Sequence, residues 1–104
     1  MTRHARWAGL FGALLVTITL GCGPEPLDAG WALFRDGDLD GARAYFEALG
    51  RQGGRGPDVD VALGEIALSL MEFDVASEHF SHARSAARNH VDAWVGYGEA
   101  LLRS

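Results

Sequence analysis

Hydrophobic residues recur at helical spacing through most of the chain after residue 26. They fall three and four positions apart, so they lie along one side of a helix, whereas a half-buried strand would alternate. The residues of two such faces are Ala42, Phe46 and Leu49 in one segment, and Ala76, Phe80, Ala83 and Ala87 in the next. The pattern predicts an all-α fold built from helix pairs.

Two breaks separate the predicted helices. Gly37 can take the left-handed conformation that ends a helix, and Asp38 can cap the helix that follows, which is typical of a turn between antiparallel helices. Residues 50–57 contain four glycines and a proline, and this composition predicts a loop. Pro57 or Asp58 is expected to open the next helix.

The chain repeats itself at one constant shift, which carries Gly30 onto Gly64 and Gly64 onto Gly98. The other matched positions are Leu27, Val61 and Val95; Phe34, Leu68 and Leu102; and, in the first two copies, Asp40 and Asp74, Ala42 and Ala76, and Phe46 and Phe80. Met71 stands where the first copy has Gly37. Because a left-handed conformation costs a residue with a β-carbon about 1–2 kcal/mol, we expect that turn to be shaped differently.

A helix-turn-helix unit of about 34 residues, with small residues at helix crossings and an aromatic residue late in the second helix, resembles the tetratricopeptide repeat. The matching segments are Gly30 to Ala42 with Tyr45 and Phe46; Leu63 and Gly64, Glu72 to Ala76, Phe80 and Ala83; and Asp92 to Trp94 with Tyr97 and Gly98. The family's proline near the end of each unit is absent, and Arg88 occupies that place in the second copy. The resemblance implies a short solenoid of about two and a half units over residues 27–104.

The resemblance also implies that the first helix of each unit lines a concave, peptide-binding groove. Its predicted lining is Leu27, Trp31, Phe34, Arg35, Val61, Glu65, Leu68, Val95, Glu99 and Leu102. Such a surface suits a peptide that carries hydrophobic anchors and a basic residue. In the alternative interpretation, the apolar members are core or end-cap residues and the two glutamates are merely solvated.

The chain begins with the pattern of a signal peptide, over residues 1–21. Arg3 and Arg6 precede an uncharged run over residues 7–20, which is shorter than the about 20 residues that span a bilayer. Gly21 stands directly before Cys22, the single cysteine, and this site resembles the lipobox of bacterial lipoproteins, although Thr19 departs from the commonest pattern. The resemblance implies cleavage, lipidation of Cys22 and a lipidated linker over residues 22–26. The alternative is an ordinary signal peptide followed by a free thiol.

Charge and side-chain chemistry narrow the range of functions. The chain has 14 acidic and 9 basic residues and a net charge of -5, which argues against a nucleic-acid partner. His79 and His82 share a helix face, but the spacing matches no zinc motif, so we expect a solvated face and no metal. Arg84 and Arg88 are expected to stabilise helix ends. No serine has the context of a nucleophile, and we expect neither a catalytic residue nor a cofactor.

These patterns together predict a lipid-anchored adaptor or assembly factor of the bacterial cell envelope that faces the periplasm. Gly23, in place of aspartate, favours the outer membrane over the inner one. The last segment, Val91 to Leu102, is apolar and has no covering helix in the sequence. A protein partner, self-association into a homo-oligomer, or a continuing chain would each cover it. The alternative function is a fragment or accessory subunit of a longer periplasmic repeat protein or enzyme.

Overall fold

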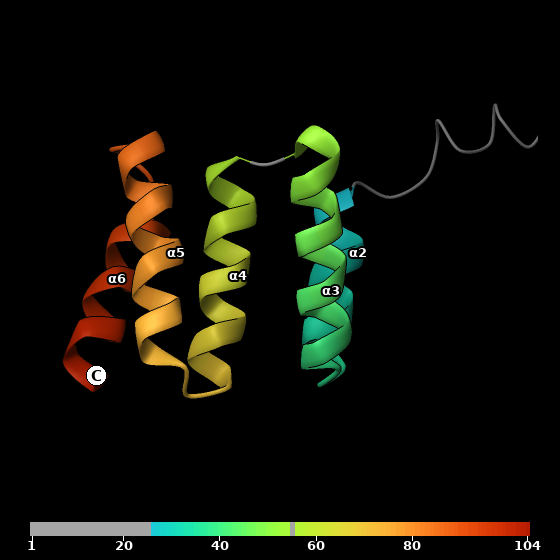
Figure 1. Cartoon of the computed structure of the whole chain (residues 1–104), viewed down its shortest axis with the longest axis horizontal. Coiled ribbons are helices and arrows are strands. Elements are labelled where there is room, and N and C mark those ends of the chain that lie inside the picture. Colours follow the sequence, from blue (N-terminus) through green and yellow to red (C-terminus); the bar gives the residue numbers. More distant parts are fainter. Residues whose placement is uncertain (1–25, 55) are drawn as a thin grey trace, which may run out of the picture.

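The computed structural model describes residues 26–54 and 56–104, and every regular element in them is helical. The elements are α2 (Pro26–Arg35), α3 (Leu39–Leu49), the π-helical turn η1 (Gly50–Gly54), α4 (Pro57–Ser69), α5 (Phe73–Ala86) and α6 (Val91–Arg103). The helices stand side by side, joined by short turns (Figure 1). The all-α prediction is confirmed. The predicted signal peptide, Cys22 and most of the linker lie outside the described residues.

The turn between α2 and α3 follows from its sequence. Gly37 has φ 84°, and its N–H donates to the carbonyl of Phe34 at 3.0 Å. The N–H of Asp38 donates to the carbonyl of Leu33, also at 3.0 Å. The Asp38 carboxylate then accepts from the N–H of Gly41 at 2.9 Å. The helix end is therefore a Schellman motif followed by an aspartate cap, as the sequence predicts.

The turn between α4 and α5 has the same shape, so the prediction of a different turn is wrong. Met71 has φ 61°, and its N–H donates to the carbonyl of Leu68 at 3.0 Å. The N–H of Glu72 donates to the carbonyl of Ala67 at 2.9 Å. These two hydrogen bonds, and the packing of α4 on α5, hold the backbone in the left-handed region against the steric preference of Met71.

The predicted loop over residues 50–57 is only partly irregular. Helix α3 continues into η1, and the N–H of Gly50 donates to the carbonyls of Phe46 and Glu47. Gly53 has φ 85°, which ends this wide turn. Helix α4 begins at Pro57, as expected, since proline is favoured in a first helical turn.

Helix α4 is the centre of the core, and it packs against α3, α5 and α6 (Figure 1). One hydrophobic cluster consists of Ala42, Phe46, Val59, Ala62, Leu63 and Ile66. The second consists of Val61, Ala67, Leu68, Ala76, Phe80, Ala83, Ala93 and Ala100. Because α4 contributes to both clusters, it is buried on nearly all sides.

Glycine and phenylalanine interlock where the helices of each hairpin cross. A β-carbon added to Gly64 would lie 2.7 Å from the ring of Phe80, and one added to Gly30 would collide with the ring of Phe46. Both rings are fully buried. Gly30 and Gly64 therefore occupy equivalent places in the two hairpins, and each precedes its ring by the same separation along the chain.

Candidate functional site

The predicted groove residues of α2 lie partly in the core. Leu27, Trp31 and Phe34 are half-buried against the first hydrophobic cluster. The ring of Trp31 meets those of Phe34 and Phe46 edge-on, with centroids 5.4 Å and 5.6 Å apart. Arg35, at the end of α2, is exposed. The aromatic end of the predicted groove therefore serves packing as well as any surface role.

The predicted groove residues of α4 and α6 differ sharply in accessibility. Val61 and Leu68 are only 6% exposed and belong to the second cluster, so they present little area to a partner. Glu65 is half-buried. Val95 and Leu102, in contrast, are exposed to 63% and 88%. The structure does not bring the ten predicted residues together as one equally accessible surface.

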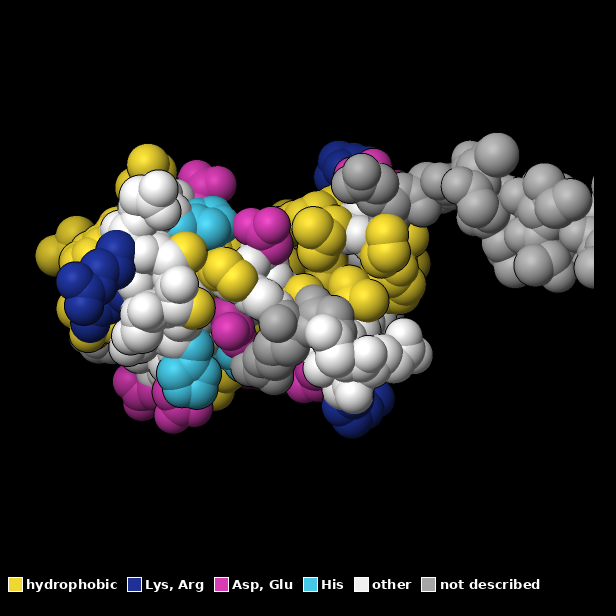
Figure 2. Space-filling model, turned by 90° about the horizontal axis from the view of Figure 1, so that it is seen from above, with side chains coloured by type: hydrophobic (Ala, Val, Ile, Leu, Met, Phe, Trp, Pro, Cys, Tyr) yellow, Lys and Arg dark blue, Asp and Glu magenta, His cyan; other side chains and the backbone are white. Residues whose placement is uncertain are grey.

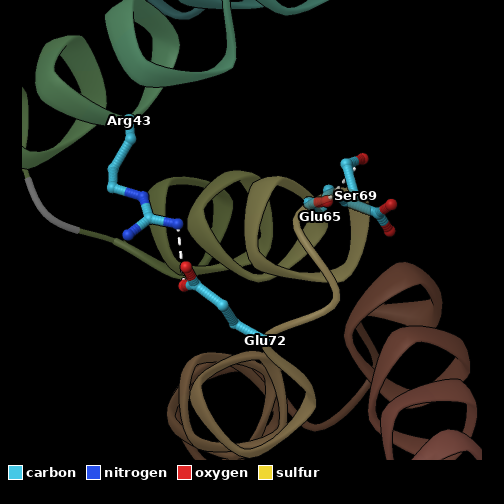
Figure 3. A network of polar contacts seen from close by, with 4 residues as sticks. All are labelled: Arg43, Glu65, Ser69 and Glu72. Atoms are coloured by element: carbon cyan, nitrogen blue, oxygen red, sulfur yellow. Dashed lines mark hydrogen bonds and ion pairs between the residues drawn. The ribbon is translucent and has the colours of Figure 1, made fainter.

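Carboxylates gather where α4 faces α6. Burial raises the pKa of Glu65 above its ordinary value, and the carboxylates of Glu99 and Asp92 raise it further. Arg103 Nη1 donates to Glu99 Oε2 at 3.2 Å. Figure 3 shows the neighbouring Ser69, whose Oγ donates to the Glu65 carbonyl at 3.1 Å. This acidic site would favour a basic group.

The outer side of α6 carries a row of exposed apolar side chains, which we call the α6 stripe. It consists of Val91, Trp94, Val95, Leu101 and Leu102, which are 48–88% exposed. Their spacing of three and four places them on one helix face. The prediction of an uncovered apolar surface is thus confirmed for this face. It is wrong for Ala100, which is fully buried, and for Tyr97, which packs against the second cluster.

A cationic side chain covers the aromatic residues of α6, which the sequence analysis missed. The guanidinium of Arg84 lies 4.2 Å from the ring centroid of Tyr97 and 4.9 Å from that of Trp94. Trp94 Nε1 donates to the carbonyl of Arg88 at 2.7 Å. Arg84 thus packs α5 against α6 by cation–π contacts, beyond its expected role at a helix end. The spacing of two aromatics three positions apart on one helix was the available signal.

The histidines make pairwise contacts between helices. His79 Nδ1 lies 3.5 Å from Asp60 Oδ1, and Asp60 is buried. The expectation of a solvated face is therefore wrong for His79, because α5 turns this residue toward α4; His82 is exposed. His90 Nε2 lies 2.8 Å from Asp58 Oδ1. Among the described residues, no group of three or more His, Cys, Asp or Glu side chains is placed to hold a metal ion.

A polar contact links the two hairpins. Arg43 Nη2, on α3, donates to Oε1 of Glu72 at 2.8 Å (Figure 3). Glu72 is the residue before α5, and its side chain does not cap that helix. The ion pair therefore adds a polar contact to the packing of α3 against α4, which holds one hairpin on the next.

A small apolar pocket of about 260 Å³ opens where the described chain begins. Its lining is Pro26, Leu27, Leu49, Gly56, Pro57, Asp58 and Val59. Hydrophobic side chains gather over this end of α2 and α3, on the face that Figure 2 shows. The pocket carries one carboxylate, Asp58, which His90 already contacts. We assign it no chemistry.

Comparison with protein-family models, curated proteins and solved structures found no match. Within residues 26–54 and 56–104, no helix has the length and hydropathy needed to cross a bilayer. On the described surface, the α6 stripe combines exposed apolar side chains with neighbouring carboxylates.

Proposed function

We propose that the protein is a lipid-anchored adaptor or assembly factor of the bacterial cell envelope, built as a short tetratricopeptide-like solenoid. The helix bounds support the repeat. Helices α2 and α4 end at Arg35 and Ser69, and helices α4 and α6 begin at Pro57 and Val91. The two helix ends, and likewise the two helix starts, are separated by the same number of residues as Gly30 and Gly64. The Schellman turns at Gly37 and Met71 have the same spacing.

The α6 stripe is the observation that carries the adaptor function. Large contiguous apolar surfaces are costly to leave in water and mark sites where another protein binds. The stripe runs the length of α6, from Val91 to Leu102, and five large or branched side chains form it. Beside it, Glu65 and Glu99 add a polar border that can select among apolar partners.

The anchor is proposed from the sequence. Residues 1–21 would be removed as a signal peptide, and acyl chains on Cys22 would hold the helices at the membrane, with the outer membrane favoured. Two or more acyl chains give stable attachment, because each buried methylene contributes about 0.8 kcal/mol. Since α2 begins at Pro26, only a few residues would separate the lipid from the first helix.

Site-specific photocrosslinking in the intact cell envelope tests the adaptor function. A photoreactive amino acid replaces Val95 in the α6 stripe, and the matched control replaces Glu47, an exposed residue of α3. We expect one defined adduct through position 95 and none through position 47. Equal labelling at both positions, or no adduct at either, would contradict the proposal.

The anchor needs a separate test. Cells expressing the Cys22→Ser variant are labelled with a radioactive fatty acid. We expect the variant to incorporate no label and to accumulate as an uncleaved precursor, while the unaltered chain is labelled and processed. Normal maturation of the variant would disprove lipidation at Cys22 and leave the crosslinking result unaffected.

A further inference from the structure

The space over the third glycine of the repeat is empty, whereas a phenylalanine ring fills the space over each of the first two glycines. Gly30 receives the ring of Phe46, and Gly64 receives the ring of Phe80. Gly98 is in register with both, since it follows Gly64 at the same shift by which Gly64 follows Gly30. Nothing lies within 4 Å of a β-carbon built on Gly98. Helix α6 therefore presents the same notch without a ring in it.

Exposed apolar side chains surround the notch on α6. Gly98 lies in the middle of the α6 stripe, with Trp94 and Val95 one turn before it and Leu101 and Leu102 one turn after it. These side chains are half or more exposed, apart from Trp94 at 48%. The opposite face of α6, with Ala93, Gly96 and Ala100, is already buried against the rest of the fold.

The two filled notches show what kind of helix fits. Each ring is preceded one turn earlier by a fully buried alanine, Ala42 before Phe46 and Ala76 before Phe80. A small residue at that position lets the backbones approach closely while the ring covers the glycine. The ring-bearing helix follows its glycine helix through a tight turn, so the two run antiparallel (Figure 1).

The border of the α6 stripe adds a charge requirement. At 100° per residue, Asp92 and Glu99 lie on the same edge of α6, next to Val95. The charges of both carboxylates raise the pKa of Glu65 of α4. Arg103 contacts Glu99, the one of these three carboxylates for which the structure shows an arginine partner. A ligand helix with a basic side chain on that edge would reduce the repulsion.

We propose that the α6 stripe docks an antiparallel amphipathic helix of a partner protein, with a phenylalanine or tyrosine ring seated over Gly98. The helix would carry a small residue one turn before the ring and a lysine or arginine facing Asp92 and Glu99. This inference rests on the proposed adaptor function and specifies the partner's chemistry.

A second copy of this chain fits the notch less well. The rings that would fill it, Phe46 and Phe80, are fully buried in a folded copy. Pairing α6 with α6 about a twofold axis in the antiparallel sense would put both acidic edges on the same side. Asp92 and Glu99 of one copy would then face those of the other, which is unfavourable.

The test uses a helix whose fit to a glycine notch the structure shows. A fluorescent peptide with the sequence of residues 73–86 is held helical by a chemical staple on its solvent side, with a lysine added on the side facing Glu99. Anisotropy measures its binding to the mature lipoprotein in nanodiscs. We expect saturable binding that weakens about tenfold or more, or about 1.4 kcal/mol, when the peptide carries Phe80→Ala.

Matched protein variants locate the binding site. Gly98→Leu fills the notch and should abolish binding, while Ala44→Leu places the same side chain at an exposed position of α3 and should not. Circular dichroism verifies that both variants stay helical, and Val95→Glu provides a second disruption of the stripe. A peptide with the added lysine should bind the unaltered protein more tightly than a peptide with glutamate at that position. Glu99→Gln should remove this difference in affinity. Unchanged binding by Gly98→Leu, or by the peptide without its ring, would overturn the proposal.

Two further outcomes separate the explanations. If sedimentation shows a dimer that Gly98→Leu dissociates, and the peptide does not bind, the occupant is a second copy and the partner-helix proposal is wrong. If position 95 crosslinks in the envelope but no ring-bearing peptide binds, the adaptor function stands and this docking mode fails.

Discussion

The ring of Phe80 occupies the space where Gly64 lacks a side chain, and a β-carbon there would lie 2.7 Å from the ring. Phe80 is fully buried and its ring also lies against Gly96 of α6, so it has little room to move aside. We expect Gly64→Ala to be destabilising, since overpacking costs about 1–3 kcal/mol. The better helix propensity of alanine returns only about 1 kcal/mol. Urea unfolding followed by circular dichroism measures the change.

Gly98→Ala is the matched control for Gly64→Ala. The same substitution at the same repeat position meets no atom within 4 Å, so helix propensity alone should act. We expect a gain of up to about 1 kcal/mol in the free energy of unfolding. Equal effects of the two substitutions would show that the crossing at Gly64 is not tightly packed.

The left-handed turn at Met71 predicts a stabilising substitution. Met71 has φ 61° and is 68% exposed, so its side chain loses little packing on removal. Met71→Gly should stabilise the fold by about 1 kcal/mol, because glycine takes this conformation without steric cost. Met71→Ala keeps the β-carbon and should change the midpoint of urea unfolding little. A destabilised Met71→Gly variant would contradict the inference that the backbone at Met71 is strained.

The ion pair between Arg43 and Glu72 predicts a weak coupling between the hairpins. Its side chains are 31% and 40% exposed, so solvent screens much of the interaction. A double-mutant cycle of Arg43→Met and Glu72→Gln should give a coupling of about 0.5 kcal/mol or less, which falls further at high salt. A large coupling that salt does not change would mean that the pair is effectively buried.

Glu65 predicts a pH dependence of stability. Burial and the carboxylates of Glu99 and Asp92 raise its pKa in the folded state, so the folded chain holds this proton more tightly than the unfolded chain. The protonated form is therefore favoured on folding, and this contribution is lost as pH rises from the ordinary value of 4.5 through the raised pKa. Glu65→Gln should be more stable than the unaltered chain at pH 7.

Urea unfolding of Glu65→Gln and of the unaltered chain across pH tests the direction of this pH dependence. The difference in unfolding free energy between Glu65→Gln and the unaltered chain should grow with rising pH through that range and then stay constant. Ser69→Ala, one turn away on α4, serves as the control and should show no such trend. A difference that shrinks as pH rises would contradict the raised pKa.

Local signals in the sequence determined the helices and several of their ends. The periodicity of Phe46 and Phe80 predicted the buried faces, Gly37 and Asp38 predicted their turn, and Pro57 predicted the start of α4. These features depend on residues within a few positions of one another. The same locality explains the errors: steric preference alone predicted a different turn at Met71, and the glycine-rich segment after Gly50 was expected to be a loop.

Tertiary packing decided which predicted surface residues are accessible. Val61 and Leu68 have the register of groove residues, yet α5 and α6 bury them, while Val95 and Leu102, at the same register one unit later, remain exposed. The stacking of Arg84 on Trp94 and Tyr97 likewise depends on how α5 lies against α6. Periodicity along one helix specifies a face, but burial of that face depends on neighbouring helices that lie far away in the sequence.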